Sequence, residues 1–264
     1  MTISGVPSQI SYIREFISAD EEAQLLEKVA TAPLPKWVTV SGRRLQNWGA
    51  TPVDNAGTAL ASALPPWLET LALRIAAVSV CESESGHVSE RTVSGRVSER
   101  GGSESELESE SERGAGRLLA AAPNHCLVNE YLPGQGILPH VDGPAYRPAV
   151  ATVSLGQHAV LDLYKRRPLD HPQAQTPDFR VLLQPRSLVV LQDELYTGYM
   201  HGIAPVTQDV VSRATIANWR EAGFDETHDD DEERVLVRSH ARVSLTFREA
   251  AKVSKLNLFG KRRR

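Results

Sequence analysis

Two side chains that can bind a metal ion lie two residues apart in the run NEYLPGQGILPHVDGP, from Asn129 to Pro144. They are His140 and Asp142. In an extended strand, residues i and i+2 leave the backbone on the same face, so this imidazole and this carboxylate would stand side by side. Two histidines and one carboxylate form the facial site that binds non-haem iron. The spacing therefore predicts two of the three ligands of an iron site.

The third ligand has to come from a later strand that faces the first two. His201 fits best, because it lies in a short strand after the apolar run Ser187–Leu191, and Gly202 permits close backbone approach. The 61 residues that separate it from the first histidine (201 − 140) leave room for strands to return. A lone strand histidine is usually a hydrogen-bonded core residue, and we interpret His125, His158 and His240 in that way.

A strand near the end of the chain predicts an anion site. In the run RVSLTFR, alternation places Arg242, Ser244, Thr246 and Arg248 on one face and three apolar residues on the other. Two buried arginines are costly unless they are paired, and a dicarboxylate offers bidentate, charge-assisted hydrogen bonds. An edge strand with a solvated polar face is the alternative interpretation.

Residues 37–57 include the run SGRRLQNWG and show no clear periodicity. The simpler interpretation is a surface loop with one buried tryptophan. The functional interpretation is a substrate-facing flap in which Arg43 and Arg44 contact phosphate and Trp48 stacks on a base. Taken alone, the pattern favours the surface loop.

The elements that must position these residues are two helices and a set of short strands. Ser18–Thr31 is predicted to be a helix, because Ser18 followed by Glu21 is a capping box, and Pro66–Val80 is predicted to be a second. Turns separate eight candidate strands, a pattern that favours a jelly roll over a parallel α/β sheet. The strands are His125–Leu132, Gly136–His140, Ala149–Leu155, His158–Tyr164, Phe179–Gln184, Ser187–Leu191, Tyr196–Ile203 and His240–Arg248.

The chain is expected to divide into four parts. Residues 1–80 hold the N-terminal helices and the flap, packed on the core. Residues 81–117 carry nine Glu and five Arg among Ser and Gly, with almost nothing to bury, and are predicted to be a disordered insertion. The jelly-roll core is assigned to residues 118–252, with polar loops at 166–178 and 208–238 on its rim, and residues 253–264 form a basic tail. The stretch 225–233 in the second loop is strongly acidic and is expected to be solvated.

Composition is that of an ordinary globular protein. The 264 residues carry a net charge of −4, which does not favour a nucleic-acid binder by charge alone, and two cysteines make no disulfide framework. Cys126 lies in an apolar run and is predicted to be a buried thiol. We find neither a signal peptide nor an apolar run long enough to span a membrane. We expect a soluble intracellular monomer in cytoplasm and nucleus, with no membrane partner.

Several separated motifs resemble one family in the right order. The HVD motif at His140, the later His201 and the Arg242–Arg248 run, with Asn129-Glu-Tyr131 upstream, resemble the AlkB branch of Fe(II)/2-oxoglutarate dioxygenases. The runs SGRRLQNWG, LVNEYLPG, PHVDGP and MHGI resemble its eukaryotic AlkB homologue 6 subgroup. The resemblance spans nearly the whole chain except 81–117 and the acidic rim loop.

The resemblance implies a mainly β fold with flanking helices and a double-stranded β-helix (jelly-roll) core. It implies Fe(II) on His140, Asp142 and His201. It also implies 2-oxoglutarate with its distal carboxylate on Arg242, helped by Asn129 and Tyr131, and with Arg248 near the keto-acid end. Ser244 stands where bacterial AlkB has Asn, which weakens one predicted contact with the cosubstrate.

The activity implied is oxidation of a substrate C–H bond by O₂, coupled to decarboxylation of 2-oxoglutarate to succinate. An N-methyl carbon hydroxylated in this way is released as formaldehyde, so the leading hypothesis is oxidative demethylation of alkylated nucleic acid, RNA or DNA. In AlkB relatives a flap covers the iron and the base is flipped beneath it, which supports the functional interpretation of Arg43, Arg44 and Trp48. Two alternatives remain: a module that binds modified RNA with little turnover, and a hydroxylase of a protein or small molecule.

Overall fold

The computed structural model of the chain describes residues 10–52, 58–81, 115–168, 176–224 and 232–254. The predicted disordered insertion, 81–117, lies outside the described residues except at its two ends. Most of the basic tail also lies outside them. Within the described residues, no helix combines the length and apolarity needed to cross a bilayer.

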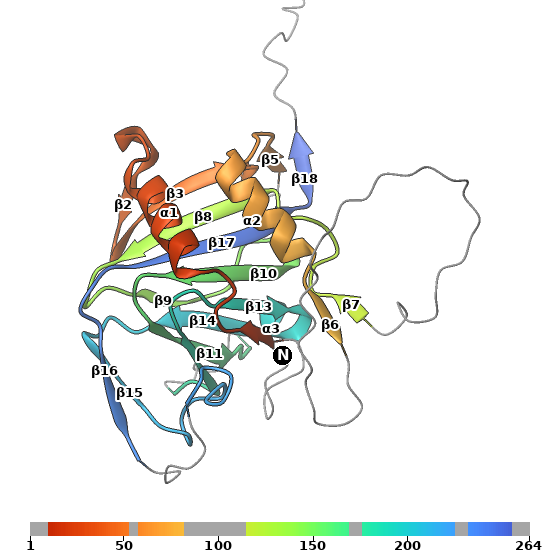
Figure 1. Cartoon of the computed structure of the whole chain (residues 1–264). Coiled ribbons are helices and arrows are strands. Elements are labelled where there is room, and N and C mark those ends of the chain that lie inside the picture. Colours follow the sequence, from red (N-terminus) through yellow and green to blue (C-terminus); the bar gives the residue numbers. More distant parts are fainter. Residues whose placement is uncertain (1–9, 53–57, 82–114, 169–175, 225–231, 255–264) are drawn as a thin grey trace, which may run out of the picture.

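Two antiparallel sheets make up the body of the fold (Figure 1). The larger sheet has seven strands in the order β1 (Ile10–Ile13), β13 (Leu188–Gln192), β10 (Tyr146–Leu155), β17 (Arg242–Ala250), β8 (His125–Tyr131), β3 (Arg43–Gly49) and β2 (Val38–Val40). The smaller sheet has four strands in the order β12 (Phe179–Leu183), β11 (Ala159–Lys165), β14 (Tyr199–Ile203) and β9 (Ile137–His140). The eight predicted strands are all present, with shifted ends, and the prediction of a mainly β fold is confirmed.

Short elements complete the described chain. A 3-10 helix (Leu34–Lys36) precedes β2, and the helix α3 (Asp193–Thr197) follows β13. A small three-stranded sheet contains β4 (Thr51–Pro52), β5 (Thr58–Leu60) and β18 (Lys252–Ser254). The two remaining pairs are β6 (Ser79–Cys81) with β7 (Ala115–Arg117), and β15 (Gln208–Val211) with β16 (Arg234–Val237).

Both predicted helices form and lie on one face of the larger sheet (Figure 1). The helix α1 (Ala19–Ala30) begins with the predicted capping box: Ser18 Oγ accepts from the Glu21 amide at 3.1 Å, and the Ser18 amide donates to the Glu21 carboxylate at 2.8 Å. The helix α2 (Pro66–Ala76) ends four residues before the predicted limit at Val80. It ends early because Ser79–Cys81 pairs with Ala115–Arg117 as a strand.

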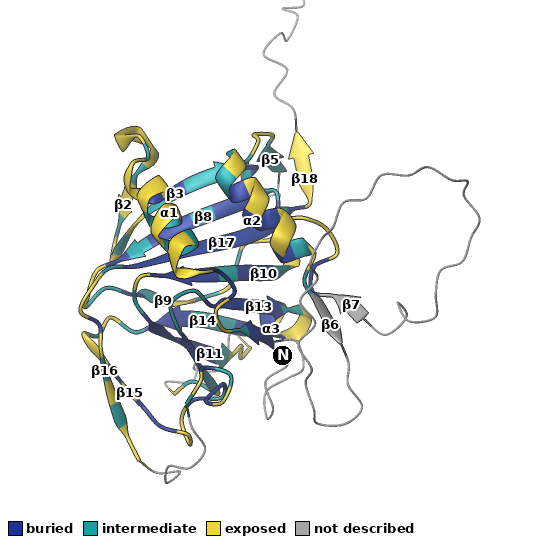
Figure 2. Cartoon of the chain, in the orientation of Figure 1, coloured by how far each residue is buried: buried dark blue, intermediate teal, exposed yellow. Residues whose placement is uncertain are grey.

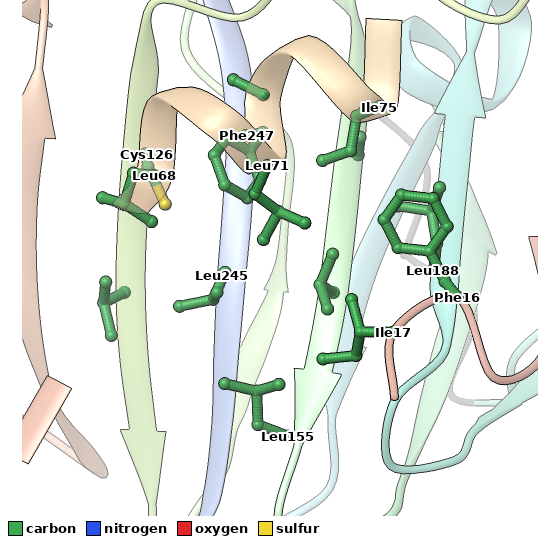
Figure 3. Close-up of a cluster of buried hydrophobic side chains, with 14 of the residues drawn as sticks. Phe16, Ile17, Leu68, Leu71, Ile75, Cys126, Leu155, Leu188, Leu245 and Phe247 are labelled. Carbon is green, nitrogen blue, oxygen red and sulfur yellow. The ribbon is translucent and has the colours of Figure 1, made fainter. Parts of the chain in front are cut away.

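The largest core cluster lies between these helices and the larger sheet. Leu68, Leu71 and Ile75 of α2 point toward Leu245 and Phe247 of β17 (Figure 3). Figure 2 shows the same layering, with buried strands beneath helices whose outer faces are exposed. Because the apolar residues of β17 face the helices, the polar ones face the smaller sheet. The strand lies between β10 and β8, which excludes the alternative of an edge strand.

Residues 38–49 differ from the predicted irregular loop, because they form β2 and β3 within the larger sheet. Alternation is hidden there because both faces of β3 carry polar residues. Gln46 is fully buried, and its amide donates to the Val29 carbonyl at 3.0 Å, which ties β3 to α1. A buried polar residue satisfied in this way is not visible as a periodic apolar pattern.

The rim segment 208–238 contains regular structure in its described parts, 208–224 and 232–238. Its two ends pair as β15 and β16, and Val211, Ile216 and Trp219 belong to a third core cluster. The prediction of a strongly acidic, solvated stretch at 225–233 falls mostly outside the described residues.

Candidate iron and cosubstrate site

The three predicted metal ligands come together beside the paired strands β9 and β14 of the smaller sheet. His140 ends β9 and is the cross-strand partner of His201 on β14, and the two ring centroids are 4.4 Å apart. Asp142 follows β9 by two residues. One ligand atom from each of the three residues lies within 4.8 Å of the others. Within the described residues, this is the group whose donors have the composition of a facial triad.

A backbone hydrogen bond determines which nitrogen of the His140 imidazole can bind a metal ion. Its Nδ1 lies 2.9 Å from the Leu138 carbonyl oxygen, which only accepts. Nδ1 therefore carries the proton, and the lone pair of Nε2 is free for a metal ion. Burial, the largest influence on His201, lowers its pKa to about 4 and keeps that imidazole neutral, as a metal ligand must be.

The carboxylate of Asp142 is held in place by Arg248 from β17. The guanidinium donates to both carboxylate oxygens, Nε to Oδ2 at 3.0 Å and Nη2 to Oδ1 at 2.6 Å, and both side chains are buried. Burial raises the pKa of Asp142, but the charges of Arg248 and then His201 outweigh burial, and the pKa is lowered overall. The ligand is therefore ionised at neutral pH, and each oxygen keeps a lone pair for a metal ion.

A pocket extends from the triad into the space between the two sheets. His140, His201 and Ile203 line it from the smaller sheet. The residues predicted to bind a keto acid line it from the larger sheet: Asn129 and Tyr131 of β8, and Arg242, Ser244 and Arg248 of β17. Thr152 of β10 and Thr246 of β17 also line it. The two sheets thus bring the predicted metal and anion residues to one cavity.

Arg242 is a buried cation without a carboxylate partner among the described residues. It is 4% exposed, Nη2 donates to Ser154 Oγ at 2.9 Å, and Nε has no hydrogen-bond partner. Burial lowers the pKa of this guanidinium to about 10. An unpaired buried donor that faces a pocket indicates a ligand with a negative group at this position. Ser154, which positions the guanidinium, was not predicted; strand alternation from Val150 to Ser154 is the signal that places it on this face.

The three predicted substrate residues on β3 do not all face the pocket. Strand alternation places Arg43 toward it, and Arg43 lines the cavity. Arg44 faces the other way, where it forms an ion pair with Glu130 at 2.5 Å and lies over the Trp37 ring. Trp48 also faces the helices, where its Nε1 donates to Gln46 at 2.8 Å and its ring packs against Trp67. The structure therefore brings only the first of the three to the pocket, because neighbouring strand residues alternate between faces.

We expect Trp48→Ala to affect stability rather than binding. Removing a large ring that packs on the first core cluster should lower the free energy of unfolding by about 2–4 kcal/mol. The KM for any substrate should change less than twofold. Denaturant unfolding and initial-rate kinetics check both parts, with Trp48→Phe as the control that keeps a ring. A protein of unchanged stability with a strongly raised KM would contradict the placement of Trp48.

The three histidines that were predicted to be core residues differ from one another in their surroundings. His158 is buried and hydrogen bonded, with Nε2 3.1 Å from Asp209, as predicted. His240 is exposed, so its prediction as a core residue is wrong. His125 is 1% exposed and stacks near Tyr146, but neither ring nitrogen has a hydrogen-bond partner among the described residues. His125 is thus a core histidine, as predicted, but its ring nitrogens form no hydrogen bond with the described residues, contrary to the prediction.

Burial lowers the pKa of His125 to about 3. The unfolded chain takes up a proton at this residue near pH 6.5 while the folded protein does not, so stability falls as the pH drops from 6.5 toward 3. Relative to wild type, His125→Phe should gain about 2 kcal/mol more at pH 5 than at pH 7. Urea unfolding at the two pH values measures the difference. The exposed His240→Phe is the control, and equal pH dependence in wild type and His125→Phe would refute the effect.

The fold and the site define a class of protein. Residues 9–248 match the model of the 2OG-Fe(II) oxygenase superfamily, and the chain belongs to that family. A Danio rerio protein named "Probable RNA/DNA demethylase ALKBH6" is 38% identical over 262 residues, which cover 97% of this chain and 92% of that protein. The chain is thus an AlkB-like 2OG-Fe(II) oxygenase closely related to that protein, and the predicted resemblance is confirmed.

Two further relatives extend the comparison. The Xenopus tropicalis protein "tRNA (carboxymethyluridine(34)-5-O)-methyltransferase alkbh8" is 31% identical over 133 residues, 50% of this chain and 19% of that protein. The solved structure of OsALKBH1 superposes with a TM-score of 0.51 at 14% identity, covering 94% of this chain and 99% of that one. That likeness supports the double-stranded β-helix fold.

Proposed function

We propose that this enzyme binds Fe(II) through His140, Asp142 and His201 and uses 2-oxoglutarate and O₂ to demethylate alkylated nucleic acid. The observation that carries the first part is that two histidines of the triad line the same pocket as Arg242, a buried arginine with no carboxylate partner among the described residues. The substrate class is supported by the Danio rerio relative, whose name describes an RNA/DNA demethylase.

The residues present fit an Fe(II) ion. Two imidazole nitrogens and one carboxylate oxygen suit iron among the divalent metals, and three ligands on one side leave positions for a keto acid and O₂. The hydrogen bonds of His140 to the Leu138 carbonyl and of Asp142 to Arg248 orient these two ligands before any metal binds. The site is therefore preorganised, and metal binding need not order these side chains.

The pocket likewise fits a dicarboxylic keto acid. Arg242 would hold the distal carboxylate, because its Nε has no partner and the pocket lies beside it. Tyr131 and Asn129 would add hydrogen bonds, and Ser244 replaces a longer amide on the same face. Arg248 is already paired with Asp142, so its contribution near the keto-acid end is to hold that ligand.

When they are bound, iron, 2-oxoglutarate and O₂ supply the oxidation of a substrate C–H bond, with release of succinate and CO₂. The protein needs no nucleophile for this chemistry; its residues position the C–H bond and exclude water. An N-methyl group that gains a hydroxyl loses formaldehyde, which restores the unmethylated base. Arg43 is the residue of the predicted substrate strand β3 that lines this pocket.

The test is production of succinate and formaldehyde by the full chain with Fe(II) and 2-oxoglutarate. Methylated RNA and DNA oligonucleotides are compared with unmethylated ones and with no oligonucleotide, and Asp142→Ala is the inactive control. We expect succinate and formaldehyde in equal amounts with at least one methylated oligonucleotide. Succinate without formaldehyde would point instead to a hydroxylase of another substrate. Tight binding of methylated RNA without either product would point to a binding module.

A further inference from the structure

Arg43 makes a contact that its predicted phosphate-binding role does not explain. Its Nε donates to Oδ1 of Asn129 at 2.9 Å, across 86 positions of sequence. Both residues line the pocket. Leu45 is the cross-strand partner of Asn129, so Arg43, two residues earlier on the same face of β3, is its diagonal neighbour. The contact therefore joins β3, the strand next to the edge strand β2, to the cosubstrate pocket.

This contact fixes which way the amide of Asn129 points. A guanidinium has donors only, so the atom that faces Arg43 has to be the carbonyl oxygen of the amide. The amide nitrogen then points away from Arg43. Asn129 is 5% exposed and lines the cavity, and the side-chain hydrogen bond found for it within the described residues is the one that Oδ1 accepts from Arg43. Because Nδ2 lies on the other side of the amide at the wall of the pocket, it is available to donate to whatever fills the pocket.

We propose that Arg43 is a positioning residue for the cosubstrate: it holds the Asn129 amide with Nδ2 directed into the pocket, ready to donate to 2-oxoglutarate. This inference rests on the proposed function and deepens it. Without Arg43 the amide is free to flip, which would present an oxygen to a carboxylate and replace attraction by repulsion. The affinity for 2-oxoglutarate therefore depends on a residue outside the core strands β8 and β17.

The neighbouring charges support this arrangement. Burial raises the pKa of the Tyr131 phenol, and the positive charges of Arg242 and then Arg43 oppose that rise. Arg43 thus lies at the same corner of the pocket as Arg242 and Tyr131. The strand that carries it is held firmly, because β3 is paired with β8 from Arg44 to Gly49 and anchored to α1 by the buried Gln46.

The experiment is calorimetric titration of 2-oxoglutarate into the full chain, with Mn(II) in place of iron so that no turnover occurs. Arg43→Met removes the donors but keeps most of the stem, and we expect the Kd to rise about tenfold, as loss of one oriented hydrogen bond to a charged ligand implies. Arg43→Lys keeps a charged donor and should stay within about threefold of wild type. In turnover with Fe(II), the KM for 2-oxoglutarate should follow the Kd while kcat changes less than twofold.

Arg44→Met is the matched control, because the adjacent arginine carries the same charge but pairs with Glu130 on the opposite face. Its Kd for 2-oxoglutarate should equal that of wild type. Equal weakening by Arg43→Met and Arg44→Met would show a general loss of positive charge and would overturn the proposal. A wild-type chain that binds no 2-oxoglutarate would overturn the proposed function itself, whereas tight binding unaffected by Arg43→Met would overturn this inference alone.

A double-mutant cycle separates positioning from direct contact. In an Asn129→Ala background there is no amide to orient, so adding Arg43→Met should have almost no further effect on the Kd. A further tenfold loss in that background would mean that Arg43 contacts the ligand itself, and the positioning role would be refuted.

Discussion

Asp142→Ala should abolish both metal binding and turnover, and it should also destabilise the metal-free protein by about 3–5 kcal/mol. The second effect arises because Asp142 neutralises Arg248, whose side chain is 7% exposed. Removing the carboxylate leaves a buried guanidinium without its counter-charge. His140→Ala removes a ligand of the same site, but His140 makes its hydrogen bond with the neutral Leu138 carbonyl and forms no ion pair within the described residues. It should abolish metal binding and cost the metal-free protein far less.

Anaerobic Fe(II) titration and urea unfolding of metal-free protein measure the two effects separately. Asp142→Asn is the matched variant that keeps the shape of the side chain but removes its charge. In Asp142→Ala/Arg248→Met, both charges are absent, and much of the lost stability should return. Equal stability losses in His140→Ala and Asp142→Ala would contradict a structural role for the ion pair. Full iron stoichiometry in either variant would refute the ligand assignment.

Arg242→Met should lower the affinity for 2-oxoglutarate at least about 100-fold, because a charge-assisted pair with a carboxylate is lost in a buried site. Its effect on stability should be the opposite of what is usual for a buried residue. Arg242 has no carboxylate partner among the described residues, so no ion pair offsets the free energy that is lost when this cation is removed from water on folding. The metal-free variant should be as stable as wild type or more stable.

Thermal unfolding with and without 2-oxoglutarate checks this prediction. The wild-type Tm should rise with ligand concentration, as binding to the folded state requires, and the Tm of Arg242→Met should not. Arg248→Met is the control on the same face of the same strand. It removes the counter-charge of the buried Asp142 carboxylate and should lower the Tm even without ligand. Loss of several kcal/mol in Arg242→Met with an intact ligand response would place the anion site elsewhere.

Sequence alone determined the features that depend on local periodicity. The HVD spacing placed two ligands close together, although Asp142 lies two residues beyond the end of β9 and not in the strand itself. The alternation of Arg242–Arg248 separated a polar from an apolar face, as the pocket and the core cluster confirm. The capping box at Ser18 located the start of α1, because a cap is set by residues within one turn. The same locality explains why eight strands could be found before their partners were known.

Tertiary structure decided what depends on contacts distant in sequence. Asp142 pairs with Arg248, whereas Arg242 has no carboxylate partner among the described residues. This difference follows from the order and register of the strands, which determine what each side chain can reach. The pairing of β3 with β8 determines which face of the sheet each β3 residue occupies. It therefore places Arg43 and Trp48 on opposite faces. The strand β3 carries polar residues on both faces, so its sequence shows no alternation of polar and apolar residues. The hydrogen-bond partners of these polar residues are distant in sequence and become known only from the fold.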